Sequence, residues 1–204
     1  MHDIVIPYKQ NNSGELEACL KLIEKNVPHR NVHVVEQYAK SHYSEKSHIN
    51  QILKLEWAIN NLDLSDEFYL FNDDFFVMEP IMGTPYYHKG TLADHITKRR
   101  GGGTYIRALR TTEEYLSPGS LSYELHIPFL FDKEKLARLI EMLKPNIVSG
   151  KCSLIRSAYG NIYEVGGEQM EDVKNIRDYA GKTYLSTSEG SFRLGVGDYI
   201  RSQL

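Results

Sequence analysis

The sequence has 204 residues, of which 41% are apolar and 25% are charged, and its formal net charge at pH 7 is −3. This composition is ordinary for a globular protein and argues against a disordered chain. The small net charge gives no global case for a polyanionic partner. No apolar run approaches the roughly 20 residues that a membrane helix needs, so we expect no membrane span.

The start of the chain and its cysteines indicate the compartment in which we expect it. Residues 1–10 enter a strand-like segment directly and lack the pattern of a signal peptide. Cys19 and Cys152 are too few for a disulfide framework, which favours a reducing environment. We therefore expect a cytoplasmic protein, of a bacterial or phage-infected cell.

The first half of the sequence alternates predicted strands with predicted helices. Short β-branched or aromatic runs indicate the strands, and apolar residues at helical spacing indicate the helices, with Ser13 as the first N-cap. Such alternation is typical of parallel strands joined by crossover helices, which predicts an α/β fold. The expected elements are strands at 3–8, 31–38 and 66–76, and helices at 13–26 and 44–61.

The second half is less regular. A helix at 132–143 is predicted from its cap at Asp132, its apolar face and the stop at Pro145. We find no internal repeat, low-complexity tract or linker, so we expect one domain spanning 1–204. The other expected elements are strands at 84–90, 104–110 and 122–131, a helix at 167–180, and a strand with a short tail at 182–204.

A local basic segment stands out from the weakly acidic whole. Between His95 and Thr112 there is no acidic residue, and three glycines, 101–103, interrupt the segment. It can be read as an anion-binding loop or as a solvated basic loop. Its basic residues are Lys98, Arg99, Arg100, Arg107 and Arg110.

Asp73 and Asp74 lie at the end of the third predicted strand, inside the apolar run 70–76. Ionised carboxylates are costly to desolvate unless a partner compensates them. Ligands of open α/β sheets bind at the carboxyl ends of the strands, and Mg²⁺ or Mn²⁺ prefers oxygen ligands and binds phosphates. The pair therefore predicts a metal site, whereas the alternative is a turn in which Asn72 or Asp73 bonds local backbone.

Four stretches of the sequence carry a family resemblance. The opening strand and helix, 3–8 and 15–26, resemble the start of nucleotide-sugar glycosyltransferases of the GT-A type. The stretch "FYLFNDDFFVMEPI" is similar to the aspartate block of the Stealth family, whose members transfer sugar-1-phosphate from nucleotide sugars. The stretch "HIPFLFDKEKLARLIEML" is similar to that family's histidine–x–proline block. The resemblance covers roughly 3–8, 15–26, 66–81 and 122–143.

The resemblance implies a fold and a set of functional residues. It implies a GT-A-like, Rossmann-like mixed sheet, mostly parallel and flanked by helices. The aspartate block implies that Asn72, Asp73 and Asp74 bind a metal and the donor diphosphate, and the other block implies that His126 is a ligand or an acid/base. The chain is shorter than typical Stealth proteins and lacks their tryptophan-containing opening, so plain glycosyl transfer is expected ahead of sugar-phosphate transfer.

Other residues are candidates on their chemistry. His126 is either a core histidine, a metal ligand with Asp73 and Asp74, or a base. The arginines Arg107, Arg110 and Arg156 have side chains suited to binding phosphate, or lie on the surface. Tyr8 and Lys9 follow the first strand, where Tyr8 either stacks on a nucleobase or packs. Asp198 is read as a ligand or a cap, and Glu168 as a residue of a first helical turn.

The sequence thus predicts a metal-dependent glycosyltransferase. In this reading Asp74, with Asp73 and His126, holds Mn²⁺ or Mg²⁺, and the donor is a nucleotide-diphosphate sugar. The expected acceptor is a carbohydrate or a hydroxymethylpyrimidine-containing phage DNA. The alternatives are a Stealth-type sugar-1-phosphate transferase acting on a polysaccharide, a metal-dependent phosphodiesterase, and a non-catalytic binding module.

Overall fold

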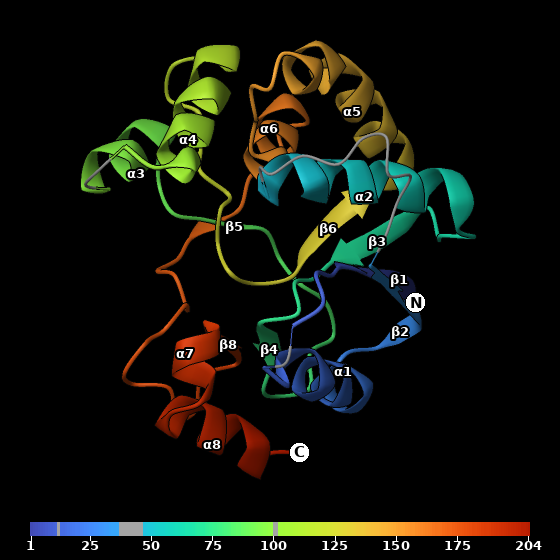
Figure 1. Cartoon of the computed structure of the whole chain (residues 1–204), viewed down its shortest axis with the longest axis vertical. Helices are drawn as coiled ribbons and strands as arrows, with labels where there is room; N and C mark the ends of the chain where they lie inside the picture. Colours follow the sequence, from blue (N-terminus) through green and yellow to red (C-terminus); the bar gives the residue numbers. More distant parts are fainter. Residues whose placement is uncertain (12, 37–46, 100–101) are drawn as a thin grey trace.

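The protein is described by a computed structural model that covers residues 1–11, 13–36, 47–99 and 102–204. Its central sheet has four strands, β1 (His2–Pro7), β2 (His29–Val35), β3 (Glu67–Leu70) and β6 (Phe129–Asp132). Their order is β2-β1-β3-β6 (Figure 1). β1 pairs in parallel with β2 and β3, and β6 runs antiparallel to β3. The sheet is mixed and mostly parallel, which confirms the predicted fold class.

Helices cover both faces of this sheet. Ile4 and Ile6 of β1 share a buried cluster with Leu22 of α1 (Glu15–Asn26). Val5 lies in another cluster with residues of α2 (Ser47–Asn61) and α5 (Lys133–Val148). Because successive strand residues point to opposite faces, β1 is buried on both sides. Figure 1 shows α1 on one side of the sheet and α2 with α5 on the other.

The two crossovers place β2 and β3 on opposite sides of β1. The chain passes from β1 through α1 to β2, then through α2 to β3 on the other side of β1. The strand order therefore reverses between β1 and β3. In open α/β sheets such a reversal leaves a crevice at the carboxyl ends of the two strands, and ligands bind there.

Smaller elements surround the sheet. β4 (Phe75–Val77) pairs antiparallel with β8 (Tyr184–Ser186), and β5 (Tyr87–His88) pairs in parallel with β7 (Glu168–Gln169). No helix among the described residues combines the length and the apolar character needed to cross a bilayer. The other helices are α3 (Leu92–Lys98), α4 (Thr104–Tyr115), α6 (Ile155–Ile162), α7 (Glu189–Phe192) and α8 (Gly195–Ser202).

The strand predicted at 104–110 is wrong, because these residues form the first turns of α4. Ile106, Leu109 and Thr112 lie three residues apart and are all buried, so they share one face of the helix. Thr112 also accepts a hydrogen bond from the backbone N–H of Leu154 at 2.8 Å. The helical period extends beyond the seven residues that suggested a strand.

The helix predicted at 167–180 is also wrong. Apart from β7 and an isolated bridge at Lys174, the segment is irregular, and Asn175 has a positive φ of 55°. Its polar side chains bond to distant parts of the chain instead of to their own turn: Asp172 bonds to Lys89, and Lys174 to Asp74. These long-range bonds hold the backbone extended despite its helix-forming composition.

Several other boundaries differ from the prediction. The strand expected at 66–76 is divided by a turn into β3 and β4, and only β5 forms within 84–90. In the stretch 122–131 only the part from Phe129 pairs as a strand. The strand expected within 182–204 forms as β8, whereas the expected tail forms α7 and α8. Ser188 and Ser191 make a capping box at the start of α7. Residues 37–38 and 44–46, and Arg100 and Gly101 of the basic segment, lie outside the described residues.

Asp3 of β1 connects the amino-terminal ends of the central strands through hydrogen bonds. Its side chain is fully buried, and it accepts hydrogen bonds from Arg30 at 2.7 Å, from Asn31 at 3.0 Å and from the Ser65 amide at 2.6 Å. Burial alone would raise the pKa of Asp3, but these donors outweigh it and hold the pKa well below its usual range. The charged carboxylate therefore stabilises the fold.

We expect Asp3→Asn to lower the free energy of unfolding by about 2 kcal/mol at pH 7, because a charge-assisted network is lost. Because the pKa of Asp3 is lower in the folded state than in the unfolded state, its carboxylate stabilises the folded protein fully at pH values above the unfolded pKa of about 4. This stabilisation is lost as the pH falls toward the folded-state pKa. Urea denaturation should therefore show a smaller difference between variant and wild type at pH 3 than at pH 7. Asp63→Asn, at an exposed partner of Arg30, is the control and should change little. Equal losses at both pH values would contradict the assignment.

Candidate functional site

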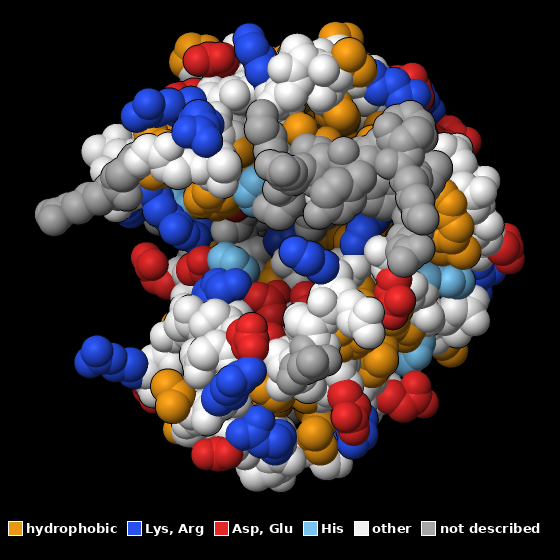
Figure 2. Space-filling view, in the orientation of Figure 1, with side chains coloured by type: hydrophobic (Ala, Val, Ile, Leu, Met, Phe, Trp, Pro, Cys, Tyr) orange, Lys and Arg blue, Asp and Glu red, His pale blue; other side chains and the backbone are white. Residues whose placement is uncertain are grey.

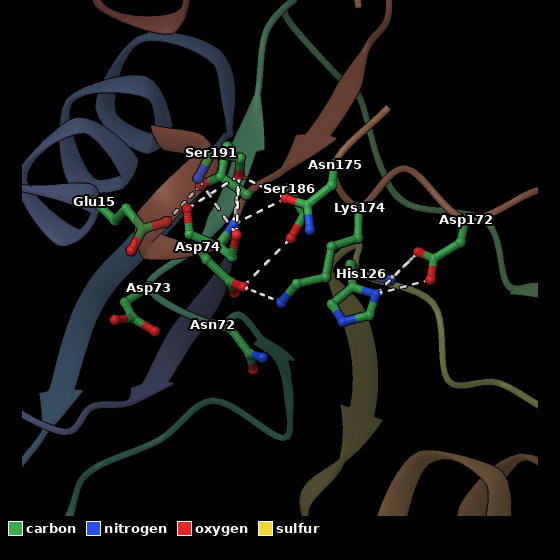
Figure 3. Close-up of polar contacts among 12 residues, drawn as sticks. Glu15, Asn72, Asp73, Asp74, His126, Asp172, Lys174, Asn175, Ser186 and Ser191 are labelled. Carbon is green, nitrogen blue, oxygen red and sulfur yellow. Dashed lines mark hydrogen bonds and ion pairs between the residues drawn. The ribbon is translucent and has the colours of Figure 1, made fainter. Parts of the chain in front are cut away.

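The carboxyl end of β3 continues into a tight turn that presents three polar side chains. The N–H of Phe71 still bonds to Val5 O of β1 at 3.0 Å, and the N–H of Phe75 closes the turn onto Asn72 O at 3.2 Å. The rings of Phe71 and Phe75 are buried, whereas Asn72 to Asp74 are half-buried. The two phenylalanines thus anchor the turn in the core and fix the carboxylates at the crevice beside β1. Figure 3 shows Asn72, Asp73 and Asp74 along this turn.

Asp74 is compensated on only one of its two oxygens. Its Oδ2 accepts from Lys174 Nζ at 2.8 Å and from Ser186 Oγ at 3.4 Å. Its Oδ1 is buried and has no hydrogen-bond partner among the described residues. An uncompensated buried carboxylate oxygen costs free energy, so this atom favours binding of a further cation or donor.

The carboxyl group of Asp73 lies close to the acidic side chains of Asp74 and Glu15. Burial, and then the neighbouring carboxylate of Asp74, raise its pKa to about 6. Its Oδ2 accepts from Asn11 Nδ2 at 3.2 Å. The buried carboxylate of Glu15 adds to the rise, and it accepts a hydrogen bond from Thr187 Oγ1 at 2.5 Å. These carboxylates together favour a positively charged ligand.

His126 is oriented by a carboxylate that the sequence analysis did not single out. Its Nδ1 lies 2.9 and 3.0 Å from the two oxygens of Asp172, which also bonds to the His126 N–H and to Lys89 Nζ. Burial would raise the pKa of Asp172, but His126 and Lys89 outweigh it and hold the pKa well below its usual range. A charged Asp172 favours the proton on Nδ1 and leaves Nε2 as an acceptor.

Arg156 enters the site from α6 as a buried cation. Its Nη1 donates to Leu125 O at 2.6 Å and its Nη2 to Asn72 Oδ1 at 3.4 Å, and the guanidinium lies over the ring of Phe75. The residue is 5% exposed, and its Nε has no partner among the described residues. Burial lowers the pKa of Arg156, and the charges of Glu124 and Asp74 oppose that change. An anion beside Asn72 would give this guanidinium its missing acceptor.

The remaining predicted residues lie in several places. Tyr8 is buried and its hydroxyl donates to Asn11 O at 3.2 Å, which favours the packing role over stacking on a base. Lys9 is exposed beyond β1, and Arg107 and Arg110 are exposed on α4. Figure 2 shows the face hollowed between the part that carries α3 and α4 and the part that carries β8 and α7, with charged and histidine side chains around the hollow.

Asp198 and Glu168, for which the sequence did not decide a role, make no contact with the aspartate turn among the hydrogen bonds and ion pairs of the described residues. Asp198 is exposed on α8 and pairs with Arg201 at 2.7 Å, so it acts in its own helix. Glu168 is exposed in β7 and does not begin a helix, which corrects that expectation.

The structure does not gather Asp73, Asp74 and His126 into a three-ligand metal site. Across 1–11, 13–36, 47–99 and 102–204, no group of three or more His, Cys, Asp or Glu side chains is placed to hold a metal ion. Mg²⁺ and Mn²⁺ are nevertheless often held by one or two carboxylates together with substrate phosphates and water. The unpartnered Oδ1 of Asp74 fits that mode of binding.

Sequence reasoning missed Asp172 and Lys174. Both fell in the segment expected to be a helix, where polar residues are read as solvated. A signal was present, since Asp172 and Lys174 alternate with Val173, which is buried. Alternation of this kind is typical of an extended chain with one buried face.

Comparisons with known proteins bear on the fold alone. No family model matches the sequence, and neither does any curated protein. Among solved structures the chain is similar to the galactosyltransferase LgtC in complex with donor and acceptor sugar analogues. The identity is 12% over 79% of this chain and 70% of that one, with a TM-score of 0.44.

The glycosyltransferase GlyE of Streptococcus pneumoniae TIGR4 is similar at the same level. Its apo form gives 10% identity over 91% of this chain and 54% of that one, with a TM-score of 0.44. A second GlyE structure gives 9% identity over 91% of this chain and 55% of that one, with a TM-score of 0.45. The chain thus spans little more than half of GlyE. The resemblance to the Stealth family stays a prediction.

We expect His126 to carry its proton on Nδ1, because Asp172 accepts there. Long-range ¹H–¹⁵N spectra at pH 8 should show this tautomer in the wild type and in Asp172→Asn, whose amide oxygen can still accept. Asp172→Ala should shift the population toward the Nε2–H form. His126→Gln identifies the signal. A wild-type histidine protonated on Nε2 would contradict the orienting role of Asp172.

Proposed function

We propose that this protein is a metal-dependent glycosyltransferase that moves a sugar from a nucleotide-diphosphate sugar to an acceptor hydroxyl. The observation that carries the proposal is the Asp73–Asp74 turn at the β1/β3 crevice, with a raised pKa at Asp73 and an unpartnered oxygen on Asp74. Carboxylates held in this state favour a divalent cation and, through it, a diphosphate.

The donor would lie across the carboxyl ends of β1 and β3. Asp74, with Asp73 beside it, would hold Mg²⁺ or Mn²⁺, which stabilises the negative charge that develops on the leaving diphosphate. Arg156 offers the donor an unpartnered guanidinium N–H from the buried side of the site. Lys9, exposed just after β1, supplies positive charge at the open side.

His126 is the group best placed to act as a base. Its Nδ1 is engaged by Asp172, so its Nε2 can accept the proton of an acceptor hydroxyl as that oxygen attacks the sugar. Phe75 lies edge-on to the imidazole, 6.0 Å between ring centroids, and links this histidine to the aspartate turn. The base and the cation-binding carboxylates therefore belong to one rigid cluster.

The acceptor class follows from the basic segment. Arg107 and Arg110 are exposed on α4, and Lys98 and Arg99 end α3 nearby in the chain. This surface favours an acceptor that carries negative charge. A charged carbohydrate polymer and hydroxymethylpyrimidine-containing DNA both meet that requirement.

The donor test is a panel of nucleotide sugars with and without Mn²⁺. A true donor present at 100 times its dissociation constant should stabilise the wild type by about 2.7 kcal/mol, measured by thermal unfolding. Asp74→Ala should lose this stabilisation and reduce Mn²⁺-dependent turnover at least about 100-fold, because the charge that holds the cation is gone.

The same assay separates the alternatives. Asp198→Asn, in a surface pair of α8, is the matched control and should keep full activity. Release of nucleoside diphosphate indicates glycosyl transfer, whereas release of nucleoside monophosphate indicates sugar-1-phosphate transfer. Phosphodiester hydrolysis without a sugar donor would identify a phosphodiesterase, and full activity of Asp74→Ala would refute the assignment of the site.

The acceptor surface predicts a salt dependence. If α4 binds a polyanion, the Arg107→Ala/Arg110→Ala variant should weaken binding of hydroxymethylpyrimidine-containing DNA and reduce the slope of log K against log [salt] by about one per arginine. Lys21→Ala, on the exposed face of α1, removes one charge as a control. Fluorescence anisotropy at several salt concentrations measures both effects. DNA affinity that does not respond to salt would exclude DNA as the acceptor.

A further inference from the structure

Lys174 places a positive charge on Oδ2 of Asp74, beside the oxygen Oδ1 at which a further cation would be expected to bind. Its Nζ lies 2.8 Å from Asp74 Oδ2, and the other carboxylate oxygen is buried without a partner among the described residues. The protein thus supplies one positive charge to a carboxylate that can accept more. Figure 3 shows the lysine reaching from the side of His126 toward the aspartate turn.

The backbone under Lys174 explains how the lysine reaches Asp74. Lys174 forms an isolated bridge with Ser186 at the end of β8, and Ser186 pairs with Phe75, the residue after Asp74. The N–H of Asn175 also bonds to Ser186 O at 2.8 Å. The lysine backbone is therefore fixed next to the turn, and only its long side chain would have to move for the ammonium to change partner.

The side chain of Lys174 is able to leave Asp74. It is 31% exposed, so its ammonium can reach water or a ligand without crossing the core. A lysine binds as a compact point charge with no fixed geometry, unlike the planar guanidinium of Arg156. Asp74, in contrast, is held in place by Phe75 and by its position in the turn.

We propose that Lys174 is an internal counter-ion of Asp74 that becomes a ligand of the donor diphosphate when a divalent cation binds Asp74. This inference rests on the proposed function and adds a donor-binding residue to it. A divalent cation alone would meet the ammonium as a like charge, so it binds Asp74 weakly. The charges of the cation and of a diphosphate cancel, so the two together leave the displaced ammonium with an anionic partner.

The buried arginine supports an anion at this place. The Nε of Arg156 has no partner among the described residues, and its Nη2 bonds to Asn72, two residues before Asp74. A phosphate group between Arg156 and the rotated Lys174 would satisfy both cations. The donor would then be bound by a cation on Asp74 and by two protein cations.

The experiment measures two affinities that should change in opposite directions. Lys174→Met should bind Mn²⁺ alone at least about fivefold more tightly than the wild type, because the competing ammonium is gone. The same variant should bind the preformed Mn²⁺–pyrophosphate complex more weakly, because a phosphate ligand is gone. Electron paramagnetic resonance of free Mn²⁺ measures the first affinity, and calorimetry with the complex measures the second.

Control variants keep the test decisive. Lys174→Arg keeps the charge and should resemble the wild type in Mn²⁺ affinity. Lys21→Met removes an exposed lysine paired with Glu17 at 2.8 Å and should change neither affinity. If Lys174→Met does not fold, Lys174→Gln is interpreted in the same way.

The outcomes separate this inference from the proposed function. If the wild type binds the Mn²⁺–pyrophosphate complex but Lys174→Met does not tighten Mn²⁺ binding, or does not weaken binding of the complex, the role of Lys174 is refuted and the proposed function stands. If neither protein binds Mn²⁺ or the complex, the proposed function fails and this inference fails with it.

Discussion

The site depends on one constraint, which is that two adjacent carboxylates are held half-buried at the end of β3. Phe71 and Phe75 impose it, because both rings are anchored in the core on either side of the turn. The carboxylates of Asp73 and Asp74 are only half-exposed, and burial together with the charge of Asp74 raises the pKa of Asp73. The ammonium of Lys174 offsets part of the cost of a buried charge at Asp74, whereas the carboxylate of Glu15 adds to that cost at Asp73.

The compensating groups come from distant parts of the chain. Asn11 reaches Asp73 from the loop after β1, Arg156 approaches through Asn72 from α6, and Lys174 reaches Asp74 from the segment after β7. None of these contacts is local, so the site forms only when the second half of the chain has packed onto the β1–α1–β2–α2–β3 unit. Folding and assembly of the site are therefore coupled.

The sequence predicted the parts of the fold that depend on local pattern. The alternating strands and helices of the first half, and the helix capped by Asp132, have clear periods, and the structure confirms them with shifted ends. Two predicted end signals are wrong, because the N-cap of α1 is Gly14 and not Ser13, and α5 continues past Pro145 to Val148. The position of Asp73 and Asp74 at a strand end was predicted from the same local pattern. The pairing of His126 with Asp172 could not be, because 46 residues separate them and the contact has no local signature.

The predicted strand at 104–110 failed for a different reason than the predicted helix at 167–180. In the first case the buried residues follow a helical period, but this period becomes clear only when Thr112, beyond the seven residues 104–110, is included. In the second case the local composition favours a helix, and long-range ion pairs outweigh it. Propensity is a weak preference, so a few partly buried charge-assisted bonds are enough to override it.

The register of one extended segment links the two halves of the candidate chemistry. Asp172 orients His126, Lys174 neutralises Asp74, and Val173 between them is buried. Because side chains alternate along an extended chain, a shift of one residue would exchange the buried and the polar positions and remove both contacts at once. The bridge between Lys174 and Ser186 fixes the register and so sets the base and the acidic turn together. This irregular segment is therefore held in its register by contacts with both parts of the site.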